Sequence, residues 1–148
     1  MRRPAAVLAA ALLAALALAA PMAAQDRLDG YPLYDDRRAM IRTLTDLATA
    51  GDYPGLIRAL SGTRAYSEAE VTSLAEKLDT IYGPSLDRSD ILYHRELSGS
   101  WVEEVLAFWP AGGTDYFYIN IVSHKREEGI IPVWWRYNSD IEGVLPSF

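Results

Sequence analysis

Trp-Val-Glu-Glu-Val-Leu-Ala-Phe-Trp, residues 101–109, is the stretch that decides the fold, because it is one of four consecutive β-rich runs. The runs cover residues 91–97, 101–109, 116–124 and 130–139 and are rich in β-branched and aromatic residues. Short turn signals separate them: Ser98-Gly99, Ala111-Gly112-Gly113 and Glu127-Glu128-Gly129. Links this short join only antiparallel neighbours, so the sequence predicts a four-stranded meander. Pro132 cannot donate to a ladder from mid-sheet, which favours the last run as an edge or bulged strand.

Upstream of the meander, apolar residues recur at helical spacing and predict three helices. Their expected bounds are Asp35 or Asp36 to Gly51, Asp52 to Ser61-Gly62, and Ser67 to Gly83-Pro84. Ser67 and Glu70 form the capping-box pattern that opens the third helix. Helices first and sheet second is an α+β architecture. We therefore expect one domain, residues 25–148, with three N-terminal helices packed on a curved four-stranded antiparallel sheet.

The first 24 residues are typical of a cleavable signal peptide. Met1-Arg2-Arg3 precedes an Ala, Leu and Val run over residues 7–20, which Pro21 and small residues follow. A bilayer-spanning helix needs roughly 20 apolar residues, so this run is too short for a permanent anchor. Cleavage after Ala24 and cleavage after Ala19 both remain open. We expect an exported bacterial protein, periplasmic or secreted, without a membrane anchor after cleavage.

Charge and cysteine content exclude several functions. The chain has 14 basic and 20 acidic residues and a formal net charge of −6, and loss of the two arginines of the leader makes it −8. Such an acidic chain lacks the positive surface that nucleic acid requires, so we expect no nucleic-acid partner. The absence of cysteine excludes thiol catalysis and cysteine-ligated metals.

The loop lengths also predict a strand register. A three-residue loop at 111–113 places Glu104 opposite Asn120, and a loop at 127–129 places Asn120 opposite Arg136. One face then carries Leu106, Phe108, Tyr116, Tyr118, Asn120, His124, Trp134 and Arg136, with Glu104 beside Asn120. The other carries Val105, Ala107, Phe117, Ile119, Ile121, Val133, Trp135 and Tyr137. The second face is more apolar, so we expect it under the helices; a slip of one residue would exchange the faces.

The first face supplies the candidate binding residues, which are Glu104, Tyr118, Asn120, Trp134 and Arg136. Three interpretations stay open for this aromatic and polar set. It is an ordinary amphipathic sheet face with cross-strand packing and an ion pair, a homodimer interface, or a ligand site. No catalytic residue is assigned.

The chain has only two histidines, His94 and His124, which the sequence places on different strands. Neither an HxH nor an HExxH spacing occurs, so we expect no metal site and no cofactor. His124 is interpreted as a surface residue near a turn. Glu103 and Glu104 cannot act as a pair on one face, because adjacent strand residues point in opposite directions.

The order of elements over roughly residues 36–140 resembles the nuclear transport factor 2-like, or cystatin-like, roll. More narrowly, four segments resemble a set of small exported bacterial proteins without a known activity: Ile81-Tyr82-Gly83-Pro84, Trp101 to Pro110, Val122-Ser123-His124 and Tyr137-Asn138-Ser139-Asp140. The broad resemblance implies either an isomerase, cyclase or dehydratase or a non-catalytic module, and fold analogy does not choose between them.

Two functional hypotheses follow. The first is a non-catalytic binding or dimerisation module for a small apolar ligand or a protein partner. The alternative is an enzyme with a general base inside the roll, for which His94, Glu103, Glu104 and His124 are the candidates. A titratable group facing a pocket would favour the enzyme.

Overall fold

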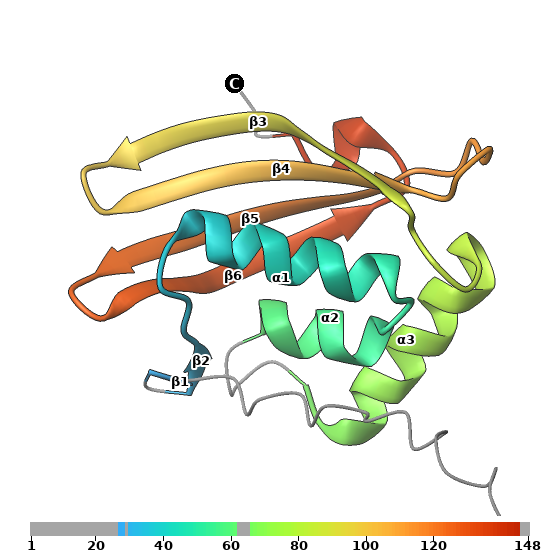
Figure 1. Ribbon diagram of the computed structural model, residues 1–148, viewed down its shortest axis with the longest axis horizontal. Coiled ribbons are helices and arrows are strands. Elements are labelled where there is room, and N and C mark those ends of the chain that lie inside the picture. The colour runs from blue at the N-terminus through green and yellow to red at the C-terminus, as the bar shows by residue number, and fades with distance from the viewer. Residues whose placement is uncertain (1–26, 29, 62–65, 146–148) are drawn as a thin grey trace, which may run out of the picture.

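The computed structural model describes residues 27–28, 30–61 and 66–145, and the predicted signal peptide lies outside the described residues. The described residues form a mixed α+β structure with three α-helices and a four-stranded antiparallel sheet (Figure 1). No helix within these ranges is long and apolar enough to cross a membrane.

The sheet confirms the predicted meander. Its strands are β3 (Arg88–Ser98), β4 (Trp101–Trp109), β5 (Phe117–Arg126) and β6 (Gly129–Asn138), in that spatial order. β6 is an edge strand, and its register shifts next to Pro132, as the missing N–H requires. A short hairpin of β1 (Arg27–Leu28) and β2 (Tyr31–Pro32) precedes the helices, and Tyr34 then bridges to Ile130 in β6.

The helices are α1 (Arg37–Thr49), α2 (Tyr53–Leu60) and α3 (Glu68–Tyr82), which agrees with the predicted bounds. Each begins at a predicted cap. Asp36 accepts from the amide of Ala39 at 2.7 Å, and Asp52 accepts from that of Gly55 at 2.8 Å. Ser67 and Glu70 make the capping box, which satisfies two backbone donors that a helix start leaves without partners. A short 3-10 helix, η1 (Ile141–Gly143), follows β6.

Figure 1 shows α1 and α2 running along one side of the curved sheet. The core between them is apolar and closely packed. Its largest fully buried side chains include Leu44, Leu56, Leu78, Phe108, Phe117 and Ile121. Burying one such side chain contributes roughly 1.5–3 kcal/mol, so this layer holds the helices on the sheet. We call the opposite side of the sheet the outer face.

The β4–β5 register differs from the prediction by one residue. Val105, and not Glu104, lies opposite Asn120, and the connection spans residues 110–116. Leu106 and Phe108 therefore point to the helices, and Val105 and Ala107 point to the outer face. The longer loop costs little entropy, whereas this register buries Phe108 against Phe117 at a centroid distance of 6.3 Å. The predicted pairing of Asn120 with Arg136 is confirmed, but the turn is one residue shorter than predicted, because Gly129 lies in β6 opposite Arg126. The register shift between Val122 and Ser123 restores the predicted pairing beyond it.

Gly51, just after α1, has φ of +69°, and a Cβ there would lie 1.8 Å from the carbonyl oxygen of Pro84. Gly112 also has a positive φ, +75°, but no atom within 4 Å of its Cβ position. We expect Gly112→Ala to lower the free energy of unfolding by about 1 kcal/mol and Gly51→Ala by about 2–4 kcal/mol, because only the second adds a steric clash. Urea denaturation measures both, and equal effects would contradict this packing.

Candidate functional site

A cavity of about 480 Å³ opens where α1 begins, and we call it the mouth pocket. The segment before α1, the end of β3 and the β5–β6 hairpin surround it. Its lining residues are mostly charged: Asp35, Asp36, Arg37, His94, Glu96, Lys125, Arg126, Glu127, Glu128, Gly129 and Ile130. None of the predicted binding residues lines it.

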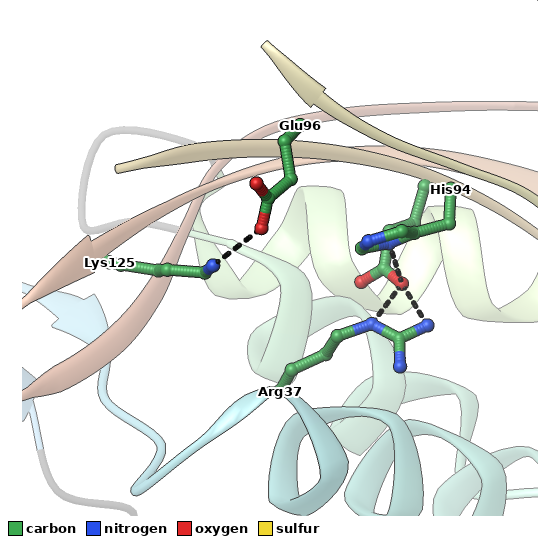
Figure 2. Close-up of polar contacts among 5 residues, drawn as sticks. Arg37, His94, Glu96 and Lys125 are labelled. Carbon is green, nitrogen blue, oxygen red and sulfur yellow. Dashed lines mark hydrogen bonds and ion pairs between the residues drawn. The ribbon is translucent and has the colours of Figure 1, made fainter. Parts of the chain in front are cut away.

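Glu104 lies behind this pocket and is fully buried. Its Oε1 accepts from Arg37 at 2.5 Å and lies 3.2 Å from Nδ1 of His94. Figure 2 shows Arg37 rising from the start of α1 and His94 descending from β3 toward the same carboxylate. The sequence brings them together because Arg37 follows the Asp36 cap directly and His94 pairs with Glu104 across the β3–β4 ladder.

A buried carboxylate is costly unless a cation and hydrogen bonds compensate for its lost hydration. Arg37 provides the cation, and its side chain and that of His94 stay 37% and 41% exposed. When neutral His94 carries its proton on Nδ1 and donates it to Glu104, Nε2 becomes an acceptor. Oε2 of Glu104 has no hydrogen-bond partner among the described residues. The arrangement can therefore orient an imidazole toward a ligand.

The other charges of the mouth pocket also pair. Lys125 lies 3.1 Å from Glu96, and its hydrogen bond, with its charge, holds the pKa of the Glu96 carboxyl below the usual value (Figure 2). Arg126 lies 4.0 Å from Glu128. Five carboxylates line the pocket against three basic side chains, so with His94 neutral the lining carries a net charge of −2.

The predicted row of Glu104, Asn120 and Arg136 is wrong, because Glu104 faces the helices. Glu103 takes its place on the outer face, where its carboxylate accepts from Asn120 at 3.0 Å. Asn120 also donates to the carbonyl of Val144 at 2.7 Å. Arg136 donates to that carbonyl at 3.0 Å and to the carbonyl of Leu145 at 2.8 Å. The polar row thus binds the segment that follows η1.

Tyr118 and Trp134, the remaining predicted residues, do lie on the outer face. Tyr118 stacks on Tyr116 at 5.7 Å, and desolvation, with Tyr116 and Asp140 adding to it, raises its pKa. Trp134 is 47% exposed, and the Arg136 guanidinium lies 5.5 Å from its ring centre. The structure therefore brings four of the five predicted residues to one face and separates Glu104 from them.

Sequence reasoning missed Arg37 and Lys125 and did not pair His94 with Glu104. In the sequence, nothing distinguishes Arg37 from an ordinary basic residue near the start of a helix. The turn after Ser98 would place Arg95, and not His94, opposite Glu104 if β3 were regular, but the register shifts between Glu96 and Ser98. His124 is also more than a surface residue, because it stacks on Trp101 at 4.3 Å.

No protein-family model matches the sequence. No curated protein matches it in sequence either. Among solved structures, the chain is similar to a domain of unknown function with a cystatin-like fold from Nostoc punctiforme PCC 73102, with a TM-score of 0.48 and 17% identity over 70% of this chain and 75% of that one. It is also similar to a nuclear transport factor 2-like protein of unknown function from Shewanella baltica OS155, with a TM-score of 0.46 and 12% identity over 67% of this chain and 88% of that one.

The chain's own elements, three helices against a curved antiparallel meander, follow one another in the order expected from the resemblance to the nuclear transport factor 2-like, or cystatin-like, roll. Both similar structures are described with a name of this fold group, and neither description states an activity. The narrower resemblance to small exported bacterial proteins stays a prediction.

Glu104→Gln removes the charge that Arg37 and His94 share, and we expect it to lower the free energy of unfolding by about 1–3 kcal/mol. Glu68→Gln is the control, because Glu68 pairs with Arg58 at 2.6 Å on the surface, where its side chain is 80% exposed. We expect no measurable change for this variant, since solvent screens an exposed pair. Urea denaturation gives both values, and an unchanged midpoint for Glu104→Gln would contradict a structural role of the buried pair.

Proposed function

We propose that the protein is a non-catalytic binding module whose ligand is a small molecule with a cationic polar group, held in the mouth pocket. The observation that carries this proposal is the excess of carboxylates around a cavity of about 480 Å³. A cationic group gains from this excess of negative charge, by a modest amount because the lining side chains are largely exposed and solvent screens them.

The packing supports a ligand at the mouth rather than in the core of the roll. The side chains between the helices and the sheet are buried and fill that space with the protein's own atoms; Leu56, Phe108 and Phe117 among them are at most 1% exposed. A small apolar ligand in the core would have to displace them. A polar ligand at the mouth displaces only water.

Propylamine tests the charge preference. We expect it to bind with a dissociation constant in the millimolar range, about −4 kcal/mol, and propionate to bind at least threefold more weakly. Backbone amide shifts of residues 94 and 96 in NMR spectra follow the titration. Glu96→Gln should weaken propylamine binding about threefold, because it removes one carboxylate and leaves the charge of Lys125 without its partner.

Glu142→Gln is the matched control, because Glu142 is an exposed carboxylate of η1 that does not line the mouth pocket. Equal binding of propionate and propylamine, or an equal loss in both variants, would contradict the proposal.

An acid–base enzyme is the second candidate, and the distance of 3.2 Å between Nδ1 of His94 and Glu104 favours it. A carboxylate that holds Nδ1 leaves Nε2 free to accept a proton from a substrate. Glu103 and His124 lie on other parts of the sheet and take no part in this pair. The two candidates differ in outcome, because an enzyme converts its ligand and a binding module releases it unchanged.

We propose in addition that two copies of the chain associate through the outer face. Trp134 and Arg136 support this, because exposed aromatic and arginine side chains are enriched in interfaces. The segment after η1 covers the middle of this face, so the contact would involve the part around Trp134. A protein partner of another kind is the alternative occupant.

Sedimentation velocity at micromolar concentration tests the dimer. We expect a dimer for the wild type and at least a tenfold weaker association for Trp134→Ala, because the variant removes the largest exposed ring of the patch. Ile81→Ala is the control, since Ile81 is 54% exposed on α3, away from the sheet. A wild-type monomer, or a dimer that Trp134→Ala leaves unchanged, would contradict an interface at this face.

Export also remains a proposal. It is supported by the leader-like pattern of residues 1–24. The intact mass of the protein recovered outside the cytoplasm would show whether cleavage follows Ala19 or Ala24.

A further inference from the structure

A second, smaller cavity of about 240 Å³ lies between α1 and β3, above β4, and we call it the apolar pocket. Ile41 and Thr45 of α1, residues 89–91 of β3, and Leu106 and Phe108 of β4 line it. It therefore lies between the same helix and the same strands that form one side of the mouth pocket and the Glu104 pair.

The residues that line the apolar pocket follow those of the mouth pocket and the Glu104 pair along both α1 and β4. On α1, Arg37, Ile41 and Thr45 follow at intervals of four residues, which places them on one helix face. On β4, Glu104 and then Leu106 and Phe108 occupy alternate positions on the helix side. Both series begin with a charged residue beside the mouth pocket and continue with residues that line the apolar pocket. The two pockets share no lining residue and lie one after the other along the same contact of α1 with β3 and β4, which we call the seam. The β4 segment beneath it, residues 104–108, is about 13 Å long.

The seam is open because the helices do not cover β3. Nearly every side chain of β3 is exposed, and Ile91, which faces the helix side, remains 40% exposed. Figure 1 shows the helices lying below β4, β5 and β6, with β3 at the upper edge of the sheet.

We infer that the seam is a single ligand groove for a cationic amphiphile, a molecule with an ammonium head and an unbranched apolar chain. The head occupies the mouth pocket, where the lining has a net charge of −2, and the apolar chain lies in the apolar pocket against Ile41 and Ile91. Asp90 and Ser89 place polar groups in the apolar pocket and favour a chain of limited length. This inference rests on the proposed function and adds an apolar chain to the cationic ligand proposed there.

Titration calorimetry with decylamine, decanoate and propylamine, each below its aggregation concentration, tests the groove. We expect decylamine to bind one per chain and at least tenfold more tightly than propylamine, because its chain is removed from water. Decanoate has the same chain and the opposite charge, and we expect it to bind at least tenfold more weakly than decylamine.

Two variants of β3 test where the alkyl chain of decylamine binds. Ile91→Ser should weaken decylamine binding at least fivefold and leave propylamine binding unchanged. Leu97→Ser is the matched control, because Leu97 is 45% exposed on the same strand and lines neither pocket. Thr45→Phe fills the apolar pocket from α1 and should also weaken decylamine binding at least fivefold while leaving propylamine binding unchanged. This variant tests the same pocket without placing a polar residue in β3.

The outcomes separate the groove from the mouth pocket. If propylamine and decylamine bind equally and both shift the amide signals of residues 94 and 96, the mouth pocket stands and the groove is wrong. If decanoate binds as tightly as decylamine, or Leu97→Ser acts like Ile91→Ser, the groove is also wrong, because binding is then nonspecific. If neither amine binds, both proposals fail.

Discussion

The register of β4 is the constraint on which the rest of the structure depends. Once Leu106 and Phe108 point into the core, the alternation of a strand turns Glu104 to the same side. A carboxylate in that position is tolerable only with a cation and hydrogen bonds, since a buried charge without a partner costs several kcal/mol. Arg37 and His94 meet this requirement, and they do so at the point where the Asp36 cap starts α1.

This placement makes the two ends of the seam chemically different. The Glu104 pair draws polar side chains to the start of α1, while the next residues of the same β4 face are apolar. The helix repeats the order, with Arg37 before Ile41. If the proposed groove binds a ligand along this seam, the change from charged to apolar walls would discriminate between ligands by the order of their groups, which neither pocket would achieve alone.

The local features of the fold could be predicted, and the non-local ones only in part. Caps such as Asp36 and Ser67 could be predicted as helix starts because they act within one turn. The predicted pairing of Asn120 with Arg136 holds although the β5–β6 turn is one residue shorter than predicted, because the register shift beside Pro132 compensates. β4 gave no such signal, since residues 102–108 are buried on both faces and show no alternation of polarity. The shifts in β3 were hidden as well, because β3 contains neither a proline, such as the one that indicated a bulge in β6, nor a glycine.

The segment after η1 explains why the candidate site moved to the other side of the sheet. Asn120 and Arg136 form the polar row that the sequence predicted, yet their donors are used by the carbonyls of Val144 and Leu145. A polar row bound to the chain's own backbone holds the sheet and its C-terminal extension together. Glu104, displaced from that row by one position of register, instead orients Arg37 and His94 toward an open cavity. One residue of slip therefore decides which face of the sheet is available to a ligand.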